Sequence, residues 1–479
     1  MTADSQLDAV VVGSGPNGLA AAITLARAGL AVRVYEAAET AGGGIRSEAL
    51  TLPGFVHDPC TTVVATTLAS PFLGSLDLAA RGVEVVHPEA PAGHTLDGGR
   101  AAILERSVEA TADGLGGDGP AYRRLMGPLV RDAERILPWV LGRPFSFPRH
   151  PLALARFGIP ALASSTLLGR LFREDAAPAL LGALSAHASN PLRQPATASF
   201  GLVLGLAAHT VGWPVVQGGS QRLADALVAE LHDLGGEVVT GTEIASLDEL
   251  PPARATLLDV TPRQLLRIGG DRLPDGYRRA LERFRYGPGV CKVDYALDGP
   301  IPWTNEGLAR AGTVHLGGTL AEIEAAERAV SRGRMPDRPF VIVVQATRFD
   351  PGRAPDGKHT AWAYAHVPHG YPGDASAELE AQLERFAPGF HERILAKAVR
   401  TAPQLEAYDP NYVGGDIGGG AQDLRQLFTR PVARWDPYST PVGGLYLCSS
   451  STPPGGGAHG MCGHLAAGSA LWREFGIRA

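Results

Sequence analysis

Short apolar runs separated by glycine form the clearest pattern at the start of the chain. Residues 9–12 are four consecutive apolar residues, a run typical of a buried strand, and the glycine-rich stretch 13–18 follows directly. Residues 19–28 are apolar enough for a buried helix, and residues 31–35 predict a second strand that ends at Glu36. The order strand, glycine-rich turn, helix and strand predicts a βαβ unit with parallel strands.

Further elements are predicted far along the chain. They are an amphipathic helix (221–234), two strands (237–240 and 255–259), a final strand (444–448), a glycine-rich loop (453–460) and a closing helix (461–473). Between them, residues 76–214 are mostly helical by pattern, whereas residues 266–411 alternate as strands do, at 290–297, 340–347 and 360–367. An antiparallel sheet covered by helices is expected from these two stretches.

The first glycine-rich turn has the spacing of a dinucleotide-binding fingerprint. Gly13 permits a tight turn, Gly15 lets the backbone approach a pyrophosphate, and Gly18 lets the helix pack on the strand. The helix N-terminus offers free N–H groups and partial positive charge to phosphates. Glu36 is placed to bind a ribose hydroxyl, and it would repel the 2′-phosphate of NADP. The alternative is a glycine-rich turn without a ligand, but every element of the fingerprint is present in order.

A second glycine-rich turn, residues 41–46, follows Glu36 closely. NAD binding does not require this second turn, which suits a longer dinucleotide whose second half carries phosphate and ribitol. Arg46 is a candidate for a bidentate phosphate contact, and the alternative is a solvated surface arginine.

These motifs carry a resemblance to a known family. Residues 10–46 resemble the FAD-binding opening of the phytoene desaturase-like flavoproteins, which belong to the amine oxidase and glutathione reductase-type superfamily. The stretches 52–60, 444–448 and 451–461 resemble one branch, the branch named for pyridine nucleotide-disulfide oxidoreductase domain-containing protein 2. The resemblance extends over the whole length and is most specific at the two ends.

The resemblance implies which residues bind FAD. They are Gly13, Ser14, Gly15, Pro16, Asn17, Gly18, Glu36, Ala37, Gly43, Gly44, Arg46, Thr61, Ile244, Ser450, Gly457, His459, Gly460 and Met461. Among these, Ile244 is expected to contact the adenine through its backbone, and Thr61 is expected to approach the flavin together with His57, Asp58 and Thr62. Ser449 stands where many relatives have glycine, which leaves open whether Ser450 or Ser451 contacts the ribitol or phosphate.

The resemblance also implies the fold class. It is an α/β fold in which a Rossmann-like FAD-binding domain of the glutathione reductase type carries an inserted α+β substrate domain. The FAD-binding domain is expected to be discontinuous (1–75, 215–265 and 412–479), and the substrate domain to comprise 76–214 and 266–411. The sheet of the substrate domain would form a roof above the flavin.

Two residues are candidates for the catalytic chemistry. The closing helix would point its N-terminus at the flavin pyrimidine and stabilise negative charge there. His459, just before that helix, has the residue type to accept or donate a proton, and the alternative is a structural histidine bonded to backbone. Asp416, within the glycine-rich stretch 414–420, is either a general base or a residue that holds a loop near the site; the alternative is an aspartate that caps a tight turn.

Composition and charge narrow the class of protein. The chain has 479 residues, of which 45% are hydrophobic and 19% charged, as expected of a globular protein with more than one core. A net charge of −6 argues against nucleic-acid binding. The four cysteines form no CxxC pair, which disfavours dithiol chemistry and structural zinc, and no metal site is predicted.

Hydropathy along the chain bears on its location. Residues 1–7 lack the basic and apolar regions of a signal peptide, so a cytoplasmic protein is expected. The apolar stretch 200–208 is well short of the roughly 20 residues of a membrane span and predicts a buried helix or a tunnel wall. Peripheral membrane contact and oligomerisation stay open.

The leading functional hypothesis is an FAD-dependent oxidoreductase. It would desaturate or oxidise an apolar small molecule, such as an isoprenoid, a lipid or a natural product, by hydride transfer to the flavin. Dioxygen or a quinone is expected as electron acceptor, because the glycine-rich stretch 114–119 follows no strand and no other NAD(P)H fingerprint is evident. Two alternatives stay open: an FAD-dependent redox-neutral isomerase or saturase, and a non-catalytic FAD-stabilised scaffold.

Overall fold

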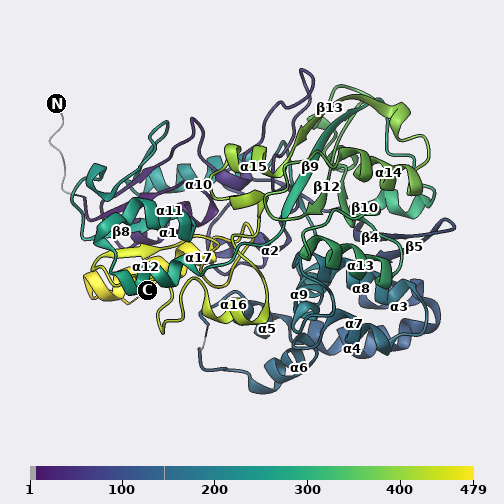
Figure 1. Cartoon of the computed structure of the whole chain (residues 1–479), viewed down its shortest axis with the longest axis horizontal. Coiled ribbons are helices and arrows are strands. Elements are labelled where there is room, and N and C mark those ends of the chain that lie inside the picture. The colour runs from purple at the N-terminus through teal and green to yellow at the C-terminus, as the bar shows by residue number, and fades with distance from the viewer. Residues whose placement is uncertain (1–6, 145, 479) are drawn as a thin grey trace.

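The computed structural model describes residues 7–144 and 146–478, which fold into two bodies with one main sheet each (Figure 1). The first sheet is parallel, in the order β14 (Leu445–Leu447), β8 (Ala255–Leu258), β1 (Ala9–Val12), β2 (Val32–Tyr35) and β7 (Glu237–Val239). The second has the order β13 (Ile394–Arg400), β9 (Gly289–Leu297), β12 (His359–Val367), β11 (Val341–Val344), β10 (Ala311–Leu316), β4 (Ala90–Leu96) and β5 (Arg100–Leu104). Strands β3 (Val85–Val86) and β6 (Val215–Val216) form a separate pair.

Helices surround both sheets. The parallel sheet is accompanied by α1 (Pro16–Arg27), α10 (Gln221–Asp233), α11 (Pro262–Gly269), α12 (Asp275–Glu282) and α17 (Met461–Ala470). The second body contains α3 (Val108–Gly114), α4 (Gly119–Arg131), α5 (Ala133–Val140), α6 (Pro151–Ala161), α7 (Ser165–Leu168), α8 (Ala176–Ala186), α9 (Thr197–Thr210), α13 (Leu320–Ser331) and α14 (Ser376–Phe386). Shorter helices are α2 (Ala65–Leu68), α15 (Ala402–Tyr408) and α16 (Leu424–Thr429).

The parallel sheet is assembled from segments far apart in the sequence. Val10 of β1 pairs with Arg33 on one side and with Thr256 on the other, both in parallel register. Strand β14 extends the sheet by pairing with β8, so the last strand of the chain lies beside its middle segment. Helices α1 and α17 contribute to one buried apolar cluster with β1, β2 and β8. This arrangement confirms the predicted α/β fold class with a Rossmann-like sheet.

The seven-stranded sheet differs from its predicted form. Strands β4 and β5 come from the stretch expected to be mostly helical, and β4 pairs with β10 in parallel. The sheet is therefore mixed rather than antiparallel. The sequence pattern did not indicate this pairing, because nothing local in β4 specifies a partner more than 200 residues away.

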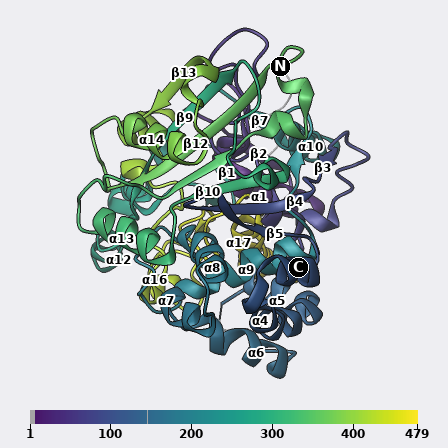
Figure 2. The ribbon, with the colours of Figure 1, turned by 90° about the vertical axis from the view of Figure 1, so that its right-hand side faces the viewer.

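Helices cover both faces of this sheet. Val341 and Val343 of β11 pack in a cluster with α14, whereas Ile342 and Val344 pack with α8 and α13. A strand buried on both faces has a continuous apolar run, as this one does. Figure 2 shows helices α4 to α9 gathered as one group beside β4, β5 and β10.

Two further observations concern segment boundaries and membranes. Tyr277 and Leu281 of α12 pack in the cluster that includes β8, so the nucleotide-binding body extends past the predicted boundary at residue 265. No single helix of the described residues is long and apolar enough to cross a membrane. The segments 151–161 and 165–171 satisfy those limits only when taken together, and they are bent by 96°.

Candidate functional site

A cavity of about 980 Å³ lies between the two bodies. At one end it is lined by the fingerprint turn, including Gly13 and Gly15, together with Glu36. It continues past the C-terminal glycine-rich loop, and at the other end it is lined by apolar residues of the second body, including Trp213 and Trp362. The site therefore has a dinucleotide end and an apolar end.

Backbone bonds hold Glu36 at the dinucleotide end. One carboxylate oxygen accepts bonds from the Ser14 N–H and the Ser14 hydroxyl, at 2.8 and 2.6 Å, and the other accepts the Ala38 N–H at 2.9 Å. Gly13 has a φ of 97°, which favours glycine, and this conformation turns the chain sharply after β1. The turn places Ser14 where it orients the carboxylate, so Glu36 is held in one position at this end of the cavity.

Asp259 lies directly behind the fingerprint turn, a position that sequence reasoning missed. Its Oδ2 accepts the Gly18 N–H at 2.8 Å, and a side chain at Gly15 would approach this same oxygen. Burial raises the pKa of Asp259 to about 8. The carboxyl is therefore mostly protonated at neutral pH and does not repel a pyrophosphate.

Arg46 is a buried cation at the same end of the cavity. It is 7% exposed, its Nε donates to the Gly43 carbonyl at 3.0 Å, and it forms no ion pair with another described residue. Its guanidinium lies 4.4 Å from the centre of the Tyr408 ring, and Arg400 lies 4.2 Å from the same ring. A buried arginine without a carboxylate partner is a site for an anion, which a phosphate supplies.

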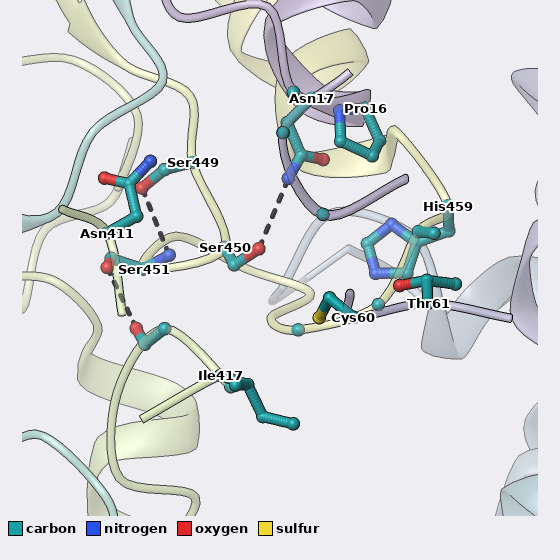
Figure 3. A pocket seen from close by; sticks show the side chains of 18 of the residues that line it. Pro16, Asn17, Cys60, Thr61, Asn411, Ile417, Ser449, Ser450, Ser451 and His459 are labelled. Atoms are coloured by element: carbon teal, nitrogen blue, oxygen red, sulfur yellow. Dashed lines mark hydrogen bonds between the residues drawn. The ribbon is translucent and has the colours of Figure 1, made fainter. Parts of the chain in front are cut away.

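The two glycine-rich ends of the chain meet in the cavity wall (Figure 3). The Asn17 amide donates to the Ser450 hydroxyl at 3.3 Å, although these residues are 433 positions apart. The Ser451 hydroxyl donates instead to the Gly419 carbonyl at 2.9 Å. Of the two predicted alternatives, Ser450 is thus the residue beside the fingerprint. Gly463 of α17 lies so close to the Asn17 carbonyl that a Cβ atom there would overlap it.

His459 lines the cavity, and its ring is held by the closing helix. Its Nδ1 accepts the Met461 N–H at 3.0 Å, and burial lowers the pKa of the ring to about 4. The imidazole is therefore neutral at pH 7, with its proton on Nε2. The Ser70 hydroxyl donates to the His459 carbonyl at 2.6 Å and anchors the loop. This geometry favours a hydrogen-bond donor over a general base.

Asp416 lies behind the loop and does not line the cavity. Its carboxylate accepts the N–H groups of Gly287, Gly418 and Gly420 at 2.7 to 2.9 Å. The buried Arg430 donates to the carbonyls of the same loop, at Gly420 and Ala421, and to that of Ser450. Of the roles considered for Asp416, the geometry favours the loop-holding one.

Most of the predicted cofactor residues line the cavity. The exceptions are Ser14, Gly18, Gly460 and Met461, which support the turn and the closing helix from behind. Thr61 and Thr62 line the cavity, but His57 and Asp58 do not. Asp58 instead forms a buried ion pair with Arg353, and the expected approach of His57 and Asp58 to the flavin stays a prediction.

The apolar end contains functional candidates that sequence reasoning missed. The indole N–H of Trp362 donates to the Thr62 hydroxyl at 2.7 Å, and that of Trp213 donates to the Thr313 hydroxyl at 2.8 Å. These bonds fix the planes of two large rings. The predicted apolar stretch 200–208 lies in the buried helix α9, and its Phe200, Val203 and Leu204 line the cavity as expected for a tunnel wall.

A pair of imidazoles lies in the same wall. His187 lines the cavity, and its Nε2 is 2.9 Å from Nε2 of the fully buried His315. Burial lowers the pKa of His187 to about 3, so the pair is neutral. No local motif marks these residues, because they lie 128 positions apart and meet only through packing.

Sequence comparisons find similar proteins over nearly the whole chain. A family model described as an NAD(P)-binding Rossmann-like domain matches residues 11–73. Pyridine nucleotide-disulfide oxidoreductase domain-containing protein 2 of Mus musculus is 26% identical, over 96% of this chain and 93% of the relative. Hydroxyneurosporene desaturase of Cereibacter sphaeroides is also 26% identical, over 94% of both chains. The similarity to these two proteins extends over more than nine tenths of each chain. The predicted resemblance is thereby confirmed.

Solved structures share the fold. An oxidoreductase from Methanosarcina mazei matches with a TM-score of 0.63 and 17% identity, over 97% of this chain and all of that one. Putrescine oxidase bound to putrescine matches with a TM-score of 0.62 and 20% identity, over 97% of this chain and 98% of that one. At 17% and 20% identity these matches show the fold, and the coarse prediction of an FAD-dependent oxidoreductase is supported by the desaturase relatives.

Proposed function

We propose that the protein oxidises or desaturates a neutral, apolar small molecule by hydride transfer to FAD. The observation that carries this proposal is the unequal distribution of charge in the cavity. Its four lining carboxylates, Glu36, Glu243, Asp259 and Asp409, belong to the dinucleotide end together with Arg46 and Arg267, whereas the third lining arginine, Arg143, lies near Trp139. The walls around Trp213 and Trp362 contain no carboxylate among the described lining residues. A cationic amine would lack a counter-ion at this end, whereas an alkane or alkene can be buried among these apolar side chains without an unpaired charge.

The dinucleotide end has the groups that FAD requires. Glu36 would hold the adenosine ribose, Arg46 a phosphate, and Ser450 with Asn17 the linker toward the flavin. The flavin, when bound, supplies the hydride acceptor. His459 would keep its ring neutral and present its Nε2 proton to an electronegative atom, while the N-terminus of α17 stabilises negative charge nearby.

The protein's contribution at the apolar end is orientation and exclusion of water. The rings of Trp362 and Trp213 are fixed by their hydrogen bonds, and α9 supplies aliphatic and aromatic contacts. Both histidines that line the cavity have pKa values far below neutrality, about 4 for His459 and about 3 for His187. This supports a step that depends on hydride transfer rather than on a base that titrates near pH 7.

Anaerobic mixing of the purified flavoprotein with candidate substrates tests the proposal. Neutral isoprenoid alkenes should bleach the flavin absorbance, whereas primary amines of matched chain length should not. Dioxygen or a soluble quinone should then restore the oxidised spectrum, because we propose these as electron acceptors. Bleaching by amines alone would contradict the proposal. Isomerised product without bleaching would assign the isomerase alternative, and flavin that no ligand reduces or converts would favour a scaffold.

A further inference from the structure

The segment 147–171 of the second body exposes several large apolar side chains. Helix α6 lies at the edge of the helical group (Figure 1), and helix α7 and the turn Gly169–Leu171 follow it directly in the chain after a sharp bend. We call the exposed apolar side chains of this region the α6–α7 patch: Phe147 (92% exposed), Leu152 (74%), Ile159 (77%), Leu162 (56%), Leu167 (54%) and Leu171 (55%). An apolar surface of this kind on a globular protein marks an interaction site.

The patch is firmly attached to the protein. On the opposite side of α6, Phe157 and Ala161 are buried in the core cluster of the helical group, and Leu168 of α7 is buried there too. Leu152 and Ile159 are seven positions apart, so they lie on the same outward face of α6. The helix is therefore apolar both toward the core and toward the outside.

The patch has a positive charge, in contrast to the chain as a whole. Residues 143–175 contain five arginines and two acidic residues, Glu174 and Asp175 at the end of the segment, whereas the whole chain has a net charge of −6. Arg149, Arg170 and Arg173 are exposed and form no ion pair with another described residue. Arg156 does form one, with Asp132. Apolar side chains surrounded by arginines complement a surface that is apolar inside and anionic at its rim.

The patch adjoins the apolar end of the cavity. Phe157 contacts the cavity from the inner side of α6, and Trp139, Arg143 and Pro144 line it from the segment just before α6. Helix α6 and the residues before it thus form part of the wall of the same cavity that Trp213 and Trp362 line.

We propose that the α6–α7 patch docks on the surface of an anionic phospholipid bilayer, with α6 and α7 lying in the plane of the interface. The docked protein would take its substrate from the bilayer, and this uptake rests on the function proposed above. Crossing the bilayer is not part of the proposal: α6 has 11 residues, fewer than the roughly 20 of a span, and it bends by 96° into the next segment. A second copy of the chain fits less well, since its arginines would face the same arginines.

Flotation of the full-length flavoprotein with lipid vesicles tests this docking. The protein should bind vesicles of phosphatidylcholine and phosphatidylglycerol and should bind pure phosphatidylcholine much less, with binding that falls as salt rises. Leu152→Ser with Ile159→Ser should lower the partition coefficient about tenfold or more, because these side chains would no longer enter the acyl region. Arg149→Glu with Arg170→Glu should lower it by a similar factor, since each arginine contributes about fivefold.

Matched controls lie on other surfaces. Leu395→Ser removes an apolar side chain that is 45% exposed on β13, and Arg332→Glu with Arg334→Glu reverses two exposed arginines after α13. These variants should bind vesicles within about twofold of the unchanged protein. Flavin absorbance and thermal unfolding of every variant verify the fold, and all altered positions are exposed.

Several results would overturn the docking. The unchanged protein would fail to float, or it would bind both lipid mixtures equally. Patch variants that bind as well as the unchanged protein would also contradict the docking, as would control variants that lose as much binding as the patch variants. A concentration-dependent dimer that disappears in Leu152→Ser with Ile159→Ser, without vesicle binding, would assign the patch to a second copy. Because flotation uses no substrate, its failure leaves the proposed oxidation standing, and unsuccessful flavin reduction leaves the docking standing.

As a second readout, an environment-sensitive dye on Leu162→Cys should report an apolar surrounding only with anionic vesicles. The same dye on Leu395→Cys should report water throughout. The four native cysteines give little background, because three are buried and Cys60 is only partly exposed. A dye at Leu162→Cys that stays in water while the protein floats would contradict the proposal, because another surface would then hold the vesicle.

Discussion

The two ends of the cavity are built by different means. At the dinucleotide end, Glu36 and Asp259 are held by bonds from backbone N–H groups, and Arg46 is fixed against an aromatic ring. At the apolar end, position is set by packing, with single hydrogen bonds that fix the indoles of Trp213 and Trp362. The first end specifies one ligand through directional contacts, whereas the second selects by shape and polarity and tolerates a range of apolar molecules.

The largest expected effect comes from separating the two chain ends that form the dinucleotide site. Gly463→Ala should force α17 away from the Asn17 carbonyl, destabilise the protein by about 3 kcal/mol and abolish flavin retention. Gel filtration with absorbance detection and thermal unfolding measure both effects. Gly74→Ala is the control, since a Cβ there meets nothing within 4 Å. A stable, yellow Gly463→Ala protein would show that the close contact is dispensable.

Removal of the buried Arg46 cation should weaken FAD binding at the dinucleotide end specifically. Arg46→Met should lower the affinity of the flavin-free protein for FAD roughly 30-fold, about 2 kcal/mol, because a buried charge-assisted phosphate contact is lost. Arg400→Met, which removes the second guanidinium beside the Tyr408 ring, should change it less than about threefold. Fluorescence titration gives both values. Equal losses in the two variants would mean that Arg46 acts only through Tyr408.

A carboxylate placed at the apolar end should affect that end alone. Val203→Glu on α9 should weaken binding of a neutral polyene probe roughly tenfold, since the charge needs water that this wall excludes. FAD affinity should stay within about twofold, and Val203→Leu should retain probe binding. If Val203→Glu lowers FAD affinity as strongly as probe affinity, the two ends are not independent.

The protonation of Asp259 predicts a dependence of stability on pH. Its pKa is raised by burial from 3.8 to about 8. Between these values the unfolded carboxyl has lost its proton while the folded one keeps it, so the flavin-free protein loses stability as pH rises from about 4 to about 8. Between about pH 5 and about pH 7, the free energy of unfolding of Asp259→Asn, measured with urea, should fall less than that of the unchanged protein. The difference should be at least about 1 kcal/mol. Parallel curves for the two proteins would mean that Asp259 ionises freely in the fold.

The smallest effect is expected at His459. Because its pKa is about 4, flavin reduction should be flat from about pH 5.5 to about pH 7.5. His459→Asn keeps an acceptor for the Met461 N–H and a donor toward the cavity, so its rate should fall less than about fivefold, and His459→Ala should fall further. Stopped-flow reduction across pH measures this. A rate that titrates near pH 6.5 and vanishes in His459→Asn would restore the role of general base.

The sequence predicted the dinucleotide end well because its determinants are local. The turn, the helix and Glu36 lie within 30 residues, and their spacing reflects one supersecondary unit. Asp259 was missed because its role arises from the parallel pairing of β8 with β1, which places the end of a distant strand behind the turn.

The apolar end has determinants that no short window contains. His187 meets His315, and Trp362 meets Thr62, through tertiary packing alone. Strand β4 was missed for a related reason: its parallel partner β10 lies far along the chain, inside the other predicted insertion. Residue types could suggest an apolar wall, but the neighbours of each ring depend on the whole fold.

The position of β14 has a consequence for the order in which the protein is made. Because β14 begins at Leu445 and completes the parallel sheet beside β8, the ribosome must release most of the chain before the cofactor site exists. The seven-stranded sheet, whose last strand β13 ends at Arg400, can close earlier. The apolar chamber is thus expected to form first during translation, and the cofactor to enter at the end.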